Sequence, residues 1–210
     1  RLEPRRVGFR YVDFVNRPML QWPQGAGPVD MDHRIELIGQ PRTKIMTRSL
    51  RLRAINHSDR ALETRLTTWF REHGSVLIGF SGGVDSAYLA CIAVAVLGAE
   101  RVLAVIGRSA SYPSEQWERA REVARQFGVP VLEVSTDEVS DPQYAANPSN
   151  RCYFCKTELW DTLAPIARER EFAVVVDGTN ADDLGDHRPG ARAAAEHEVR
   201  SPLAELGFSK

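Results

Sequence analysis

Four short apolar runs, separated by longer segments with helical periodicity, limit what this chain can fold into. The apolar runs cover residues 76–80, 102–106, 129–134 and 172–176, and the helical patterns cover residues 58–73, 87–97, 113–127 and 152–170. Apolar runs of this length are typical of strands that are buried on both faces. Strands that alternate with helices predict an α/β fold with a doubly wound parallel sheet and helices on both faces. In such a fold, ligands bind beyond the carboxyl ends of the strands.

Prolines and glycines mark the expected ends of the helices. Gly74, Gly98 and Gly128 each follow a helical pattern, where a glycine accepts the left-handed conformation that ends a helix. Pro113 suits the first turn of the third helix. Pro165 lies inside the last helical pattern and predicts a kink or an early end of that helix.

Residues 1–57 differ in character from the rest of the chain. No helical or strand period persists in them, and prolines interrupt them at Pro4, Pro18, Pro23, Pro28 and Pro41. The sequence predicts an irregular or disordered N-terminal arm here, or translated sequence upstream of a true start near Met46. Residues 58–210 are expected to form the folded domain, incomplete at its C-terminus.

Composition excludes several classes of protein. Hydrophobic residues make up 43% of the chain and charged residues 26%, as in ordinary globular proteins. No apolar stretch approaches the roughly 20 residues that span a bilayer, so no membrane contact is expected. Residues 1–60 carry 12 basic and 6 acidic side chains, whereas residues 61–210 carry 15 and 22, which makes nucleic-acid binding an unfavoured interpretation. Three cysteines are too few for a disulfide framework, and a cytoplasmic protein is expected.

The hexapeptide Ser81-Gly82-Gly83-Val84-Asp85-Ser86 lies between the first predicted strand and a helix. Paired glycines let the backbone approach a bound group, and successive N–H groups at a helix start favour an anion. The segment lacks the spacing and the lysine of a Walker loop, and it does not match Gly-x-Gly-x-x-Gly. A plain turn remains the alternative, but the strand–turn–helix context favours a phosphate site.

This hexapeptide resembles the PP-loop of the N-type ATP pyrophosphatases, which cleave ATP to AMP and pyrophosphate while adenylating a substrate. Segments 150–156, 177–183, 188–190 and 200–203 resemble, in that order, the LarE-type ATP-dependent sulfur transferases that make the nickel-pincer cofactor of lactate racemase. The resemblance implies a Rossmann-like fold of the adenine nucleotide alpha hydrolase type. It also implies an enzyme that adenylates a carboxylated pyridinium mononucleotide, releases pyrophosphate and then transfers sulfur. A homo-oligomer is expected.

The resemblance assigns roles to residues. The whole PP-loop would bind the phosphates of ATP, and Asp85 and Asp183 would hold Mg²⁺, although a carboxylate at a helix start is often only a cap. Gly178, Thr179 and Asn180 follow the fourth predicted strand and would face the nucleotide. Arg188 would act beside Asp85 in catalysis by pairing with a phosphate, and a solvated surface arginine is the alternative.

Cys152 and Cys155 form a Cys-x-x-Cys pair. The residues alone leave open a redox dithiol, half a zinc site or part of an iron–sulfur site. The resemblance implies two of three cysteines that hold a [4Fe-4S] cluster, the third lying beyond residue 210. Cys91 lies in an apolar helical segment and is expected to be a packed thiol.

Two other functions fit the same residues. One is another PP-loop adenylating enzyme, such as a tRNA-thiolating enzyme or an amide-forming synthetase. The other is a non-catalytic nucleotide-binding fragment. A tRNA enzyme needs a basic surface, which the acidic balance of residues 61–210 disfavours.

Overall fold

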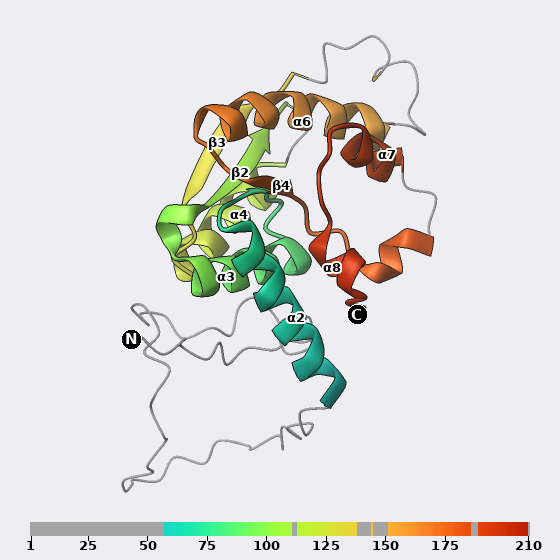
Figure 1. Ribbon diagram of the computed structural model, residues 1–210. Helices are drawn as coiled ribbons and strands as arrows, with labels where there is room; N and C mark the ends of the chain where they lie inside the picture. The colour runs from blue at the N-terminus through green and yellow to red at the C-terminus, as the bar shows by residue number, and fades with distance from the viewer. Residues whose placement is uncertain (1–56, 111–112, 138–143, 145–150, 186–188, 210) are drawn as a thin grey trace, which may run out of the picture.

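A four-stranded parallel sheet forms the centre of the protein (Figure 1). The computed structural model describes residues 57–110, 113–137, 144, 151–185 and 189–209, so the predicted N-terminal arm lies outside the described residues. The strands are β1 (Val76–Gly79), β2 (Val102–Arg108), β3 (Val131–Ser135) and β4 (Val174–Val176), in the order β3-β2-β1-β4. Val76 pairs with Val102 on one side and with Val174 on the other, so β1 is a central strand. These four strands are the four apolar runs of the sequence.

The chain reverses its direction across the sheet at β1. It proceeds from β1 outward to β2 and β3, and then crosses back to place β4 on the other side of β1. The gap between the carboxyl ends of β1 and β4 is therefore the topological switch point, where open α/β sheets bind their ligands. The predicted doubly wound parallel sheet is confirmed.

Alternate side chains of the strands enter two separate cores. Val76 and Ile78 pack with α2 (His57–His73), α3 (Val84–Leu97) and α4 (Ser114–Gln126), whereas Leu77 packs with α6 (Arg151–Glu169) and α7 (Pro189–Glu196). Figure 1 shows α6 on one side of the sheet and α2, α3 and α4 on the other. Both faces are covered, which explains why the strands read as continuous apolar runs.

The helix ends follow the expected glycines. Gly74, Gly98 and Gly128 have φ angles of +80°, +86° and +63°, the left-handed region that glycine tolerates best. Three short elements complete the described fold: η2 (Ala99–Arg101), η5 (Ala181–Gly185) and α8 (Pro202–Leu206). Val176 forms a parallel bridge with Arg200, which ties the segment before α8 to the edge of the sheet.

Two details differ from the sequence predictions. The last long helix does not end at Pro165 but continues to Glu169, because Leu163 and Ala167 on either side of the proline are both buried in the core. Burial of these side chains outweighs the loss of one backbone hydrogen bond. Pro113 occupies the N-cap position of α4 rather than its first turn, and α3 begins at Val84, inside the hexapeptide.

Among the described residues, no helix combines the length and the apolar character that crossing a bilayer requires.

Candidate active site

A cavity of about 380 Å³ opens at the carboxyl ends of the strands. A volume of this size is within the range of small-molecule sites. Its walls come from the hexapeptide, from the ends of β2 and β3, from α6 and from the loop after β4; the lining residues are Gly79, Phe80, Ser81, Gly83, Asp85, Ser86, Gly107, Ser109, Thr136, Cys155, Lys156, Leu159, Trp160, Asp177, Gly178, Thr179 and Asp183. The cavity therefore lies where the topology predicts a ligand.

The N-terminus of α3 forms one wall of this cavity. The helical hydrogen bonds begin with Ala87 N–H, which donates to Gly83 O at 2.9 Å, so the first-turn amides before Ala87 have no acceptor within the helix. Ser81 and Ser86 lie 3.2 Å apart through their Oγ atoms, and Ser86 Oγ donates to Gly83 O at 3.1 Å. These bonds fix the turn, and the positive end of the helix dipole faces the cavity.

Two glycines let neighbouring segments approach the turn. Gly82 has a φ angle of +69°, and a Cβ at this position would lie 2.5 Å from the Cα of Ala120 in α4. A Cβ at Gly178 would lie 2.7 Å from the backbone nitrogen of Ser86. The loop after β4 thus packs directly against the start of α3, and a side chain at either position would separate the two.

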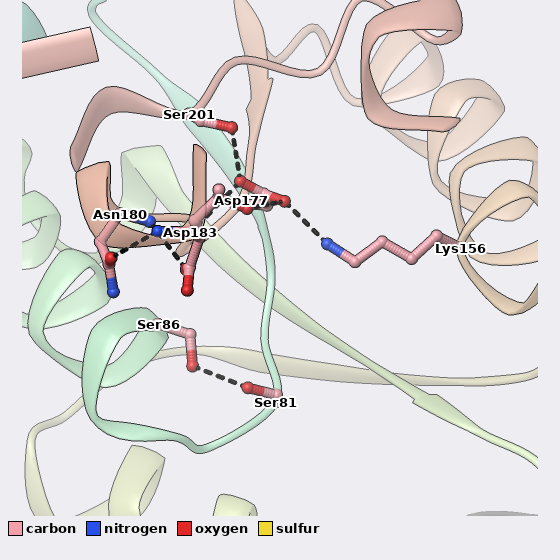
Figure 2. Close-up of polar contacts among 8 residues, drawn as sticks. Ser81, Ser86, Lys156, Asp177, Asn180, Asp183 and Ser201 are labelled. Atoms are coloured by element: carbon pink, nitrogen blue, oxygen red, sulfur yellow. Dashed lines mark hydrogen bonds and ion pairs between the residues drawn. The ribbon is translucent and has the colours of Figure 1, made fainter. Parts of the chain in front are cut away.

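Asp177 connects α6, the loop after β4 and the segment before α8. Its carboxylate is 3% exposed and accepts hydrogen bonds from Lys156 Nζ at 2.9 Å, from Ser201 Oγ at 2.7 Å and from Thr179 Oγ1 at 2.8 Å (Figure 2). Burial alone would raise the pKa of Asp177, but the Lys156 charge and these hydrogen bonds outweigh burial and hold the pKa below its ordinary value. The carboxylate is therefore charged near neutral pH, and it fixes Lys156 at the cavity.

Asn180 joins the two carboxylates that the sequence singled out. Its side-chain Nδ2 donates to Asp85 Oδ2 at 3.1 Å, and its backbone N–H donates to Asp183 Oδ2 at 3.1 Å. Figure 2 shows Asn180 and Asp183 above the start of α3, on the same side as Ser86. Asp85 and Asp183 thus reach the cavity from different elements and share one hydrogen-bonding partner.

The donors at this wall fit a magnesium ion. Mg²⁺ is usually held by one or two carboxylates together with substrate phosphates and water. Asp85 and Asp183 supply two such carboxylates, and the α3 N-terminus beside them suits a phosphate. No group of three or more His, Cys, Asp and Glu side chains gathers as a metal site among the described residues, so the remaining ligands would come from phosphate and water.

The two cysteines of α6 do not complete an iron–sulfur site in this structure. Cys152 and Cys155 are both exposed, and Cys155 lines the cavity. The chain has one other cysteine, Cys91, which lies in α3. Burial raises the pKa of Cys91 far above its ordinary value. A [4Fe-4S] cluster needs more thiolate ligands than this pair supplies. The iron–sulfur cluster therefore stays a prediction.

The structure brings most of the predicted residues to one place. Ser81, Gly83, Asp85, Ser86, Gly178, Thr179 and Asp183 line the cavity. Three others lie behind the wall: Gly82 against Ala120, Val84 in the first turn of α3, and Asn180 fully buried. Arg188 lies outside the described residues, and Cys152 lies one helical turn before Cys155. Whether these residues bind a ligand stays a prediction.

Lys156, Asp177 and Ser201 received no role in the sequence analysis, although each lies in one of its four motif segments. Only the position of Asp177 in the chain could have identified it: the residue directly follows β4, and ligands bind at the carboxyl ends of parallel strands. Lys156 and Ser201 become recognisable only through their contacts with Asp177.

Comparisons with known proteins agree with this geometry. Residues 55–151 match the NAD synthase family. The chain is 48% identical over 145 residues to an uncharacterized protein, slr1717, of Synechocystis sp., a match that covers 69% of this chain and 54% of the relative. It is 34% identical over 135 residues to the pyridinium-3,5-bisthiocarboxylic acid mononucleotide synthase of Lactiplantibacillus plantarum, covering 64% of this chain and 49% of that enzyme. The chain thus spans about half the length of these curated relatives.

A solved structure shares the fold. The NH3-dependent NAD synthetase of Campylobacter jejuni matches with a TM-score of 0.53 and 13% sequence identity, over 72% of this chain and 78% of that chain. Residues 55–151 therefore resemble an NAD-synthase-like PP-loop domain, and the chain is similar in sequence to the mononucleotide synthase of L. plantarum.

Proposed function

We propose that the cavity binds ATP and that the protein is an ATP pyrophosphatase-type sulfur transferase. It adenylates the carboxylate of a pyridinium carboxylate mononucleotide and then directs sulfur to the activated carbon. The observation that carries this proposal is the α3 N-terminus opening on a cavity at the topological switch point, beside Asp85 and Asp183. The similarity to the mononucleotide synthase of L. plantarum supports the choice of substrate.

The charges around the cavity suit an anionic nucleotide only with help from cations. Asp85, Asp177 and Asp183 line it, and Lys156 is the only Lys or Arg among its described lining residues. Lys156 Nζ has three donors, of which one bonds to Asp177. We assign the others to a phosphate, with Mg²⁺ at Asp85 and Asp183 supplying further charge compensation.

The reaction follows from the poor reactivity of a free carboxylate. A carboxylate oxygen of the substrate attacks the α-phosphorus of ATP, forming a new O–P bond while the bond to the bridging oxygen of pyrophosphate breaks. First-turn amides of α3 and Lys156 stabilise the negative charge that develops on the phosphates. Bound Mg²⁺ would supply charge neutralisation of the leaving pyrophosphate. The acyl-adenylate then carries AMP as a leaving group for a sulfur nucleophile.

Isotope transfer tests this mechanism. The protein is incubated with ATP, Mg²⁺, added sulfide as the sulfur nucleophile, and substrate whose carboxylate carries ¹⁸O, and the products are analysed by mass spectrometry. Attack by the carboxylate places one ¹⁸O atom in AMP after transfer to a sulfur nucleophile, and pyrophosphate is released. Unlabelled AMP would indicate simple hydrolysis, and ADP would exclude the proposal.

Replacing Asp85 tests the site itself. Asp85→Asn should lower pyrophosphate release by at least about 10-fold. The substitution removes a negative charge that would hold Mg²⁺ beside the leaving pyrophosphate. Glu118→Gln, on the exposed surface of α4, removes one carboxylate outside the cavity and serves as the control. Equal activity of both variants would remove Asp85 from the reaction.

A further inference from the structure

We propose that Asn180 is a positioning residue that holds Asp85 and Asp183 in the orientation in which they bind a divalent cation together with nucleotide phosphates. This inference rests on the proposed function. It adds a residue that supports the site without contacting the ligand. Asn180 is 0% exposed and is not among the residues that line the cavity.

Each hydrogen bond of Asn180 joins it to one of the two candidate ligands or to the backbone beside one of them. Its side-chain Oδ1 accepts from the N–H groups of Asp182 at 3.0 Å and Asp183 at 3.3 Å. Its Nδ2 donates to Asp85 Oδ2 at 3.1 Å, and its backbone N–H donates to Asp183 Oδ2 at 3.1 Å. One buried residue therefore contacts a carboxylate on α3 and another on η5.

Half of this arrangement is a helix cap. Asn180 precedes η5, and the reciprocal bonds between Asn180 and Asp183 have the pattern of a capping box. Capping needs only the Oδ1 acceptor and the backbone, however. The Nδ2 bond reaches a residue 95 positions away in the PP-loop, and capping gives no reason for it. That bond distinguishes a positioning role from a merely structural one.

A fixed carboxylate binds a cation more tightly than a mobile one because less rotational freedom is lost on binding. Asp85 and Asp183 belong to different elements, so their relative placement depends on what joins those elements. Asn180 supplies that link directly, while Gly178 permits the close approach of its loop to Ser86. Groups that orient metal ligands typically contribute about 10–100-fold to metal affinity.

Asn180→Ser separates the two roles. Serine is a good capping residue, so its hydroxyl can still accept from the N–H groups of Asp182 and Asp183, but it is too short to replace the donor to Asp85. The experiment measures Mn²⁺ binding to the full chain by electron paramagnetic resonance, with an ATP analogue whose α,β-bridging oxygen is a methylene group. We expect Asn180→Ser to weaken Mn²⁺ binding about 10-fold or more. The affinity for the analogue in EDTA should stay within about 2-fold of wild type, because binding of the analogue without metal does not depend on the two carboxylates.

The matched control removes one hydrogen bond between a side chain and a backbone N–H group at the opposite end of the sheet. Ser75 Oγ accepts from Ala173 N–H at 3.0 Å, and Ser75→Ala should lower the melting temperature without changing Mn²⁺ affinity. If Asn180→Ser weakens binding of the analogue in EDTA as much as it weakens Mn²⁺ binding, the role of Asn180 is structural and the inference is wrong.

A double-mutant cycle gives a second test that does not depend on one variant. If Asn180 acts through Asp85, Asn180→Ser should weaken Mn²⁺ binding much less in an Asp85→Asn background than in wild type. Equal losses in the two backgrounds would overturn the inference. Wild-type protein that binds neither the analogue nor Mn²⁺ with it would instead contradict the proposed function, so the two failures are distinguishable.

Discussion

Asp177 is a charged residue that is buried, which sets it apart from the other charged residues in the described part of the chain. Its carboxylate is buried and accepts from Lys156, Ser201 and Thr179, and its backbone N–H donates to Arg200 O at 2.9 Å. A buried carboxylate of this kind is tolerated because each oxygen has partners. Its removal would leave several donors, including the ammonium group of Lys156, without their acceptor.

The lowered pKa of Asp177 predicts an acid-dependent contribution to stability. A carboxyl group with a folded pKa below its unfolded value stabilises the protein above the unfolded pKa and loses that effect as pH falls through the folded pKa. The ordinary value is 3.8, so the contribution is present above about pH 4 and declines below that. Urea unfolding of wild type and Asp177→Asn should differ by about 1–3 kcal/mol at pH 7, and the difference should shrink as pH falls below 4.

Ser201→Ala provides the comparison for Asp177. It removes one of the hydrogen bonds and keeps the ion pair with Lys156, so it should cost about 1 kcal/mol. The loss of stability below pH 4 should remain but become smaller, because the ion pair still lowers the pKa of Asp177. A difference between Asp177→Asn and wild type that stays constant from pH 7 to pH 3 would show that the Asp177 pKa is not lowered.

At the scale of elements, the turn between β1 and α3 is held by close packing rather than by a side-chain cap. Gly83 occupies the N-cap of α3 without a side-chain hydrogen bond. Gly82 packs against α4, and Gly178 brings the loop after β4 against the first turn of α3. The first-turn amides of α3 are thus positioned by two neighbouring elements that are distant in sequence.

Two glycines with similar positive φ angles allow this packing to be measured. Gly82 and Gly128 have φ angles of +69° and +63°, but only Gly82 has a neighbour within reach of a Cβ. Gly128→Ala should cost about 1–2 kcal/mol from the left-handed conformation alone. Gly82→Ala should cost about 1–3 kcal/mol more, because Ala120 must move. Equal unfolding free energies for the two variants in denaturant titration would contradict the close contact.

The strands and the phosphate turn could be predicted from sequence because their signals are local. An apolar run predicts a strand and a following glycine pair predicts a turn, as at Val76–Gly79 and Gly82. The partners of Asp177 could not be predicted, because Lys156 and Ser201 are 21 and 24 residues away in the chain. The position of Asn180 after a strand predicts a residue that faces the nucleotide, whereas the structure buries it completely and leaves it out of the cavity lining.

At the scale of the whole molecule, the charge balance disfavours a nucleic-acid partner and the topology favours a small ligand. Residues 61–210 carry more acidic than basic side chains, which disfavours a nucleic-acid backbone as partner. The cavity lies at the switch point between β1 and β4, and its volume suits a nucleotide-sized group. The homo-oligomer, the irregular arm of residues 1–57 and the location in the cytoplasm stay predictions.

The indole of Trp160 gives the cavity an intrinsic optical reporter. A Cβ at Gly79 would lie 2.5 Å from Trp160 Cη2, so the glycine makes room for the ring in the cavity wall. Lys156 Nζ lies 5.4 Å from the ring centroid, and an anion that draws on this ammonium changes the electric field across the indole. With Trp22, Trp69 and Trp117 replaced by phenylalanine, the remaining emission spectrum should shift as ATP is titrated in, and occupancy could be followed in real time without any attached dye.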